Sequence, residues 1–174
     1  EMPEISDLLN GNLKYKYDPI EIVNEPGTVF QYSGAGFIVL QHIIEALEDK
    51  SIHEITKKYI DKIGLSNFTF NVKTILQHEY AYGYLSDGSV VDGTRKMFPA
   101  FAAGAMSTSF DTLKFLTQLT SAFKNANSKT PISHECAVLM LHGKDHRSVE
   151  FMGAKMGLGV FIADAGLNKF MLHQ

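Results

Sequence analysis

The sequence predicts a mainly α-helical protein with small β-hairpins. In several stretches of roughly ten residues or more, apolar side chains recur every three or four positions, which is typical of amphipathic helices. In two places a turn-forming pair, Asp87-Gly88 and Ala165-Gly166, separates two short apolar runs, which indicates paired strands. The helical signals cover more of the chain than the strand signals, so the fold class is predicted as mainly α.

Length, composition and charge exclude several classes of protein. The 174 residues, 45% hydrophobic and 20% charged, suit one ordinary globular domain. The formal net charge of −3 comes from interspersed signs, so we expect neither a nucleic-acid-binding face nor a polybasic membrane anchor. The longest mainly apolar stretch, residues 34–47, is shorter than the roughly 20 residues that a membrane span needs. The single cysteine, Cys136, excludes an internal disulfide and a cysteine-rich metal site.

Residues that are typical of helix ends mark the first two expected helices. A short helix over residues 3–9 has proline at an early position and Gly11 after its end. The next helix follows Ser33, a plausible N-cap, and carries apolar residues at helical spacing. Its inward residues are expected to be Phe37, Leu40, Ile44 and Leu47.

Three further helices are expected, each preceded by serine. Ser51 and Glu54 have the spacing of a capping box, and Gly64 ends that helix. A Ser-Thr-Ser run precedes the next helix, and Ser133 caps the last, in which Cys136 is expected to be a core thiol. The residues expected to face inward in the first two of these helices are Ile52, Ile55, Tyr59 and Ile63, and then Leu113, Leu116, Leu119 and Phe123.

Short β runs complete the predicted elements. One hairpin is expected over residues 80–91 and another at the end of the chain, formed by residues 157–162 and 169–173. Residues 28–32 and 68–70 are also expected to be β-like. The segment 100–106 is rich in small residues, as where backbone must come close to another part of the chain.

Tyr32 is the residue whose position suggests chemistry. It lies at an expected strand-to-helix junction beside Ser33 and three small residues, where the N–H groups of the helix start favour negative charge. A phenol has an ordinary pKa of about 10, which an adjacent cation lowers, so a tyrosinate at such a junction is a candidate general base. The alternative interpretation is that Tyr32 is a half-buried packing residue and Ser33 only a helix cap.

Four blocks of residues occur in a fixed order that resembles a known family. The first runs from Glu25 to Glu45 and contains Pro-Gly-Thr-Val-Phe-Gln-Tyr-Ser-Gly-Ala-Gly-Phe; the others are residues 62–70, 102–115 and 156–161. The first block is similar to the Pro-Gly-x-x-Phe-x-Tyr-Ser-Asn-x-Gly-Tyr signature of the β-lactamase-related serine hydrolases, which include class C β-lactamases, DD-peptidases and esterases. The resemblance spans nearly the whole chain, and four ordered blocks are more specific than one.

The resemblance implies a fold and a set of site residues. Residues 1–155 are expected to be the mostly helical insert of a β-lactamase/transpeptidase-like fold, and residues 156–174 the first strands returning to its α/β domain. The family uses a Ser-x-x-Lys nucleophile, a Tyr-x-Asn base, and a Lys-x-Gly or His-x-Gly strand. On this resemblance Tyr32 is the general base, Ser33 and Gly34 contribute to substrate binding, and His173 starts a His-x-Gly.

Two departures from the family pattern qualify this interpretation. Gly34 occupies the asparagine position of Tyr-x-Asn, so the amide that would hold a substrate amide is missing, which leaves ester or peptide chemistry more open. No Ser-x-x-Lys precedes Tyr32, and neither end of the chain resembles a natural terminus, so we expect an inactive fragment of a longer enzyme. Ser121-Ala-Phe-Lys124 matches Ser-x-x-Lys but follows the tyrosine motif, and we interpret it as a chance match.

The resemblance therefore predicts part of a serine hydrolase that acts through an acyl-enzyme on an ester, peptide or β-lactam carbonyl. It implies no metal or organic cofactor, and His142, Asp145 and His146 are interpreted as parts of a solvated loop. The alternative is a non-catalytic penicillin-binding-like sensor or binding protein that keeps the fold.

The expected partners are a small-molecule or peptide substrate, with neither nucleic acid nor a membrane span. The C-terminal hairpin carries apolar residues and expected unpaired edges, so strand-mediated self-association is also predicted. A periplasmic or secreted location fits the resemblance, and a chain with one cysteine is equally compatible with the cytoplasm.

Overall fold

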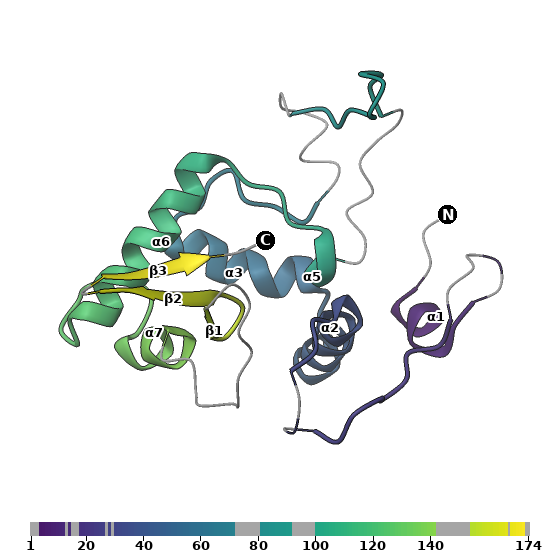
Figure 1. Cartoon of the computed structure of the whole chain (residues 1–174), viewed down its shortest axis with the longest axis horizontal. Coiled ribbons are helices and arrows are strands. Elements are labelled where there is room, and N and C mark those ends of the chain that lie inside the picture. The colour runs from purple at the N-terminus through teal and green to yellow at the C-terminus, as the bar shows by residue number, and fades with distance from the viewer. Residues whose placement is uncertain are drawn as a thin grey trace. The chain divides into compact units, whose positions relative to one another are not determined.

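A computed structural model describes residues 4–12, 14, 18–26, 28, 30–71, 81–91, 100–141, 154–166 and 168–172. The helices, in chain order, are α1 (Ile5–Asn10), α2 (Gly34–Glu48), α3 (Ile52–Ile63), α5 (Ala100–Ala103), α6 (Ser109–Lys124) and α7 (His134–Leu141) (Figure 1). The strands are β1 (Lys155–Met156), β2 (Phe161–Ala165) and β3 (Asn168–Leu172). The predicted fold class, mainly helical with small antiparallel β structure, is confirmed.

The chain divides into two compact units. The first comprises Glu1–Ile20 and Ser33–Thr112, and the second comprises Glu21–Tyr32 and Leu113–Gln174. Helix α6 begins in the first unit and continues into the second. The division into residues 1–155 and 156–174, which the resemblance implies, stays a prediction.

Side-chain caps define the helix starts in the first unit, as the sequence predicts. The Oγ atom of Ser33 accepts the backbone N–H of Gly36 at 3.0 Å, which fixes the start of α2. At α3, Ser51 and Glu54 form the expected capping box, and the hydrogen bonds from Ser51 hold the pKa of the Glu54 carboxyl below its usual value. Gly64 ends α3 in the left-handed conformation, with φ 78°.

The core of the first unit lies where α2 meets α3 and α5. Ile52, Ile55 and Ala100 are buried there, with Ile44, Phe70 and Phe101 packed against them. Two polar side chains of α2 also reach the neighbouring helices. Gln41, 4% exposed, accepts the Phe101 N–H at 3.2 Å, and Glu45 accepts the Ile52 N–H at 2.7 Å. Both N–H groups lie in the first turn of a helix, where no intrahelical partner exists, so α2 satisfies them.

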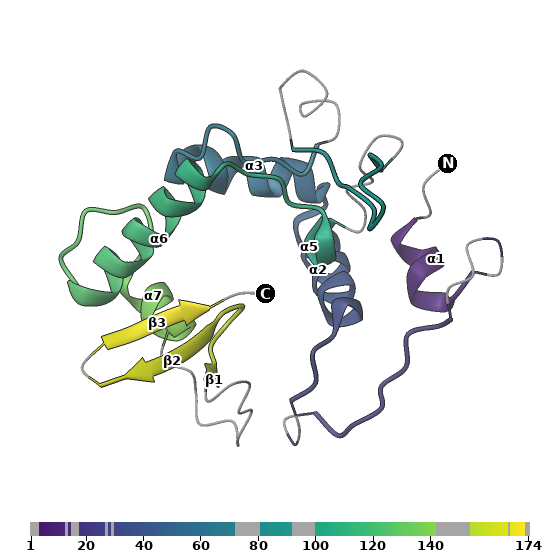
Figure 2. The ribbon, with the colours of Figure 1, turned by 45° about the horizontal axis from the view of Figure 1, so that its top comes forward.

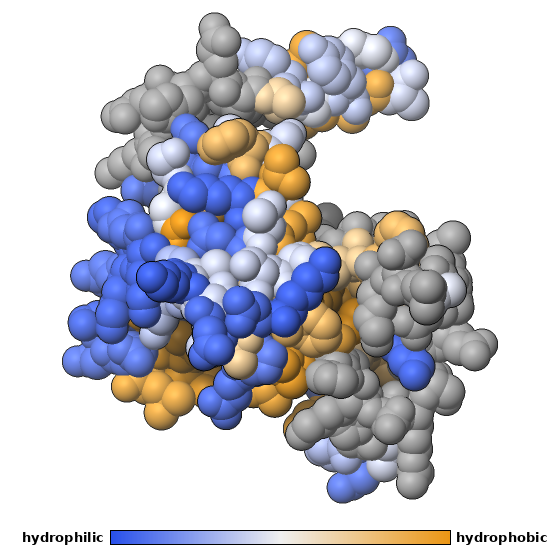
Figure 3. Space-filling view, turned by 90° about the vertical axis from the view of Figure 1, so that its left-hand side faces the viewer, coloured by the Kyte–Doolittle hydropathy of each residue, from blue (hydrophilic) through white to orange (hydrophobic). Residues whose placement is uncertain are grey.

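The prediction of which face of α2 points inward is wrong for most of the named residues. The hydrogen bonds of Gln41 and Glu45 explain the difference. The buried residues of the helix are Ile38 and Gln41. Of the four residues predicted to face inward, Ile44 packs against the core, whereas Phe37, Leu40 and Leu47 are exposed. Because Gln41 and Glu45 bond to α5 and α3, the helix turns those positions inward and leaves part of its apolar stripe at the surface. Exposed apolar side chains also occur elsewhere, and Figure 3 shows one face on which hydrophobic patches lie below a largely hydrophilic band.

Three further residues differ from the predicted burial. Tyr59 and Leu113 are exposed although both were expected to face inward. Cys136 is also exposed, so the prediction of a core thiol is wrong. The buried positions of α7 are Ala137 and Leu141, which lie four residues apart on one side of the helix. Cys136 lies one residue before Ala137 and therefore on a different side of the helix.

The second unit contains a three-stranded antiparallel sheet in the order β1-β2-β3 (Figure 2). Ala165 pairs with Asn168 beside Gly166, whose φ is 63°, so the predicted C-terminal hairpin is confirmed. Its first strand begins later than expected, at Phe161. Residues 157–160 instead form a turn, in which the Gly157 N–H donates to the Val160 carbonyl at 2.7 Å.

Helices α6 and α7 each bury small or apolar residues in the second unit, and a hydrogen bond links them. Leu119, Ala122 and Ala137 are fully buried. The ring Nδ1 of His134 lies 2.8 Å from the carbonyl oxygen of Ala122, which ties the start of α7 to α6. The Oγ atom of Ser133 accepts the backbone N–H of Cys136, so the predicted cap of α7 is confirmed.

The other predicted β runs form less than expected. Tyr84 and Val90 pair across the Asp87-Gly88 turn, but the pairing is one isolated bridge. Thr69 forms a similar single bridge with Met106. Among residues 28 and 30–32, which the structure describes, none lies in a strand.

We expect Asp111 to stabilise the first unit more than an exposed aspartate does. Asp111 is 1% exposed, and its Oδ2 accepts the Asn67 N–H at 2.6 Å. Asp111→Ala leaves that N–H without its partner and should lower the free energy of unfolding by about 2 kcal/mol, measured by urea denaturation. The control is Asp61→Ala, which removes a surface ion pair with Lys57 and should cost about 0.5 kcal/mol or less. Equal losses would contradict this role of Asp111.

Candidate active site

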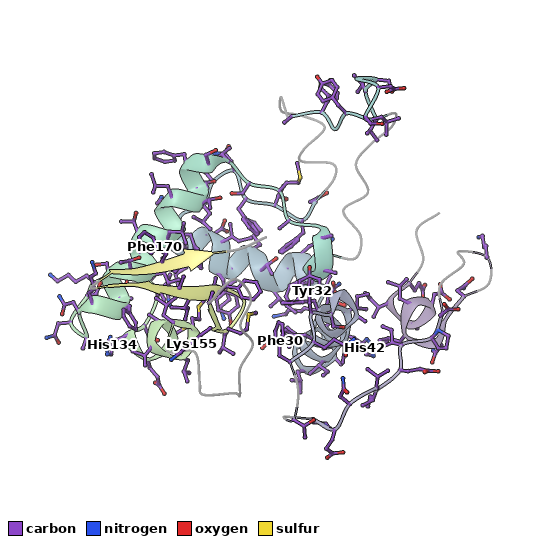
Figure 4. The ribbon with its side chains drawn as sticks, viewed as in Figure 1. Phe30, Tyr32, His42, His134, Lys155 and Phe170 are labelled. Atoms are coloured by element: carbon purple, nitrogen blue, oxygen red, sulfur yellow. The ribbon has the colours of Figure 1, made fainter. Side chains whose placement is uncertain are left out.

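The segment that leads to Tyr32 is held on the sheet of the second unit by one aromatic contact. The rings of Phe30 and Phe161 meet edge to face, with centroids 6.4 Å apart and planes at 72°. Figure 4 labels Phe30 and Tyr32 in this segment. Phe161 is the first residue of β2, so the contact places the segment beside the start of that strand.

The same residue connects this segment with the end of β3. Phe161 pairs with Leu172, and the next residue in the sequence is His173. His173 itself lies outside the described residues. Phe161 thus contacts Phe30, two positions before Tyr32, and pairs with Leu172, one position before His173.

The side chain of Tyr32 is open to solvent among the described residues. It is 71% exposed, so it is not the half-buried packing residue of the alternative interpretation. Tyr32 directly precedes Ser33, the N-cap of α2. Because the N-terminal end of a helix carries a partial positive charge, a negative charge developing near this junction would be stabilised.

The other two predicted site residues lie at the same helix start. The Ser33 hydroxyl accepts the Gly36 N–H, so its observed role is that of a cap. Gly34 is the first residue of α2, and a Cβ atom added to it would lie 4.0 Å from the Cβ of Ala102 in α5. This is an ordinary van der Waals distance. A larger side chain at position 34 would therefore begin without a clash.

The Ser-x-x-Lys match in α6 lies at the end of that helix. Ser121 is exposed, and its Oγ atom lies 3.3 Å from the Oγ of Ser128. Its described hydroxyl neighbour is thus another serine. This setting agrees with a polar helix end.

Within the part of the chain that the structure describes, no group of three or more His, Cys, Asp or Glu residues gathers as metal ligands would. His142, Asp145 and His146 lie outside that part. No described helix is both long enough and apolar enough to span a bilayer.

Sequence reasoning did not single out the pair Phe30 and Phe161. Phe30 belongs to the Phe-x-Tyr of the first block, which is the local signal that was present. Its partner lies far away in the sequence, and no periodicity or spacing within either segment predicts their contact.

Comparisons with known proteins identify a matching family and several similar solved structures. A protein-family model described as Beta-lactamase matches residues 9–173. An octameric penicillin-binding protein homologue from Pyrococcus abyssi is 21% identical, with a TM-score of 0.71, and the match covers 95% of this chain and 36% of that one. A beta-lactamase/D-alanine carboxypeptidase from Pseudomonas syringae is 18% identical, with a TM-score of 0.66 and coverage of 90% and 43%.

A third solved structure is the D-amino acid amidase from Ochrobactrum anthropi SV3 in complex with L-phenylalanine amide. It is 19% identical, with a TM-score of 0.66, and the match covers 99% of this chain and 49% of that one. The chain thus spans between about a third and a half of the length of these structures, and such identities show a shared fold. No protein with a curated description matches. The family model covers nearly the whole sequence, and on this ground the chain belongs to the Beta-lactamase family.

Proposed function

We propose that this chain is part of a serine hydrolase that attacks an ester, peptide or β-lactam carbonyl through an acyl-enzyme. Relatives in the Beta-lactamase family are hydrolases, which supports the reaction class. The observation that carries the proposal is the contact of Phe30 with Phe161. It holds the segment ending at Tyr32 beside the strand whose partner leads into His173.

In the proposed reaction Tyr32 moves the proton. A serine hydroxyl is a weak nucleophile until a base removes its proton. The phenolate oxygen of Tyr32 would take that proton while the serine oxygen bonds to the carbonyl carbon. The phenol would then return the proton to the leaving group as the bond to that group breaks, and water would release the acyl group by the same steps in reverse order.

Gly34 favours substrates that do not need a side-chain amide as a hydrogen-bond partner. Without a side chain at this position, α2 offers no carboxamide beside Tyr32 to pair with a substrate amide. Esters require no such partner because they lack an N–H donor. Within the three carbonyl classes, we therefore propose esters as the preferred substrates of the intact enzyme.

A non-catalytic binding protein is the second candidate. The presence of Gly34 at the asparagine position favours it. A test for covalent adducts on a longer protein that contains this chain would distinguish the two functions. The hydrolase forms a penicillin or acetyl adduct on a serine and releases it, whereas the binding protein forms no covalent adduct.

Self-association through β3 is proposed for the chain by itself. Among the described strands, β3 pairs only with β2 and lies at the edge of the sheet. An edge strand offers backbone donors and acceptors to another chain. The Pyrococcus abyssi homologue is described as octameric, which supports association in a similar protein.

The 174-residue chain is expected to be catalytically inactive, because no serine with a neighbouring lysine precedes Tyr32. Incubation with a chromogenic cephalosporin and with p-nitrophenyl acetate should give no turnover above a heat-treated sample. Mass spectrometry after fluorophosphonate treatment should find Ser121 unlabelled. A covalent adduct on Ser121 would show that the nucleophile lies in α6 and would overturn the proposed order of the site.

A further inference from the structure

The segment from residue 21 to residue 32 has a single described packing point. Each of its described residues is exposed except Phe30, which is half-buried. Asn24 and Gln31 share a side-chain hydrogen bond of 2.8 Å, but both are exposed, so this bond joins two parts of the segment without attaching it to the sheet. Among the described residues of the second unit, Phe30 is therefore where the segment is attached.

Phe161, the residue that Phe30 contacts, is held in the sheet from both sides. It lies in the central strand and pairs with Met156 of β1 on one side and with Leu172 of β3 on the other. A residue paired on both sides has little freedom to shift along the sheet. Its contact with Phe30 is edge to face, so the positive edge of one ring meets the negative face of the other. This geometry restricts the direction from which the Phe30 ring approaches Phe161, and the contact also buries apolar surface of both rings.

We infer that Phe30 and Phe161 are positioning residues, whose edge-to-face contact fixes Tyr32 beside the end of β3. Tyr32 lies two positions after Phe30, and among the described residues its own side chain is largely open to solvent. Its place in the second unit is consequently set through Phe30. The functional part of this inference rests on the proposed role of Tyr32 as the base, whereas the positional part stands on the contact itself.

The test measures backbone order at Tyr32 in the 174-residue chain. In the unchanged protein, the ¹⁵N order parameter of the Tyr32 amide should be about 0.85, the value of rigid backbone. Phe30→Leu keeps an apolar side chain but removes the ring, and it should lower this parameter below about 0.6, the range of flexible backbone. Phe161→Leu should have the same effect, and the double variant should be no worse than either single one, because both remove one contact.

Phe170→Leu is the matched control. Phe170 lies on β3 of the same sheet and is 51% exposed, so the same substitution should leave the order of Tyr32 unchanged. Hydrogen exchange of the Ala163 and Met171 amides, in the middle of the paired strands, shows whether the sheet is intact. If Phe30→Leu unfolds the sheet, Phe30→Tyr decides the matter, since it keeps the ring: retained order at Tyr32 supports the inference and lost order overturns it.

The outcomes separate this inference from the proposed function. Unchanged order at Tyr32 in Phe30→Leu, with an intact sheet, overturns the positioning role whatever the chemistry of the longer protein. Since the order parameter needs no turnover, a longer protein that proves inactive overturns the proposed function and leaves the measured positioning standing.

Discussion

Replacing Gly157 with alanine is expected to lower the free energy of unfolding by about 3 kcal/mol, the upper end of the usual cost of overpacking. The added Cβ would lie 2.3 Å from the carbonyl oxygen of Met140 and 3.0 Å from Cδ1 of Ile162. The Met140 carbonyl also accepts the Leu158 N–H at 3.1 Å. Relief of the clash would therefore separate the end of α7 from the turn before β2 and break this bond.

Gly36→Ala is the control for that substitution. An added Cβ at this position of α2 would lie 3.6 Å from the Cβ of Ser33, which is an ordinary contact. Alanine should raise stability here by about 0.5–1 kcal/mol, because glycine is a poor helix former. Urea denaturation measures both variants, and hydrogen exchange at Ile162 locates the damage. A Gly157→Ala protein as stable as Gly36→Ala would show that the close approach of α7 is not as described.

Tyr32→Phe is expected to reduce acylation by roughly 10²–10⁴-fold in a longer protein that joins this chain to its Ser-x-x-Lys segment, which is the usual loss when a general base is removed. The substitution deletes only the phenolic oxygen that would hold the proton. Stopped-flow measurement of the p-nitrophenol burst from p-nitrophenyl acetate gives the acylation rate directly. Binding should change little, since the ring remains.

Tyr59→Phe provides the comparison for this result. Tyr59 is an exposed tyrosine of α3, so deletion of its hydroxyl should leave the acylation rate unchanged. An equal rate in the Tyr32→Phe and unchanged proteins would remove Tyr32 from the mechanism. A loss in both variants would point to a general effect of removing a tyrosine hydroxyl.

Local signals in the sequence predicted where helices begin and end. The caps at Ser33, Ser51 and Ser133 and the stop at Gly64 depend on residues within one helical turn, so a reader of the sequence can find them. The inward face of α2 could not be found in this way. Gln41 is polar, and its burial depends on the Phe101 N–H, which lies in a distant part of the chain.

The candidate site was likewise predicted only where local sequence signals exist. Tyr32 and Gly34 were found from their place in an ordered set of motifs and from the helix start that follows them. The attachment of their segment was not found, because the Phe30–Phe161 contact joins residues that no local pattern connects. The roles of Tyr32, Ser33, Gly34 and His173 stay predictions, and the rate and order measurements test that of Tyr32.

One surface thiol sets a condition on experiments with this protein. Cys136 is the single cysteine of the chain, and it is exposed on α7. In an oxidising buffer two chains are able to join through one disulfide, whereas strand pairing through β3 makes no covalent bond. A dimer that a reducing agent abolishes is thus a cross-link, and one that persists has another origin. The same thiol offers a single attachment point for a fluorescent or spin probe on the second unit.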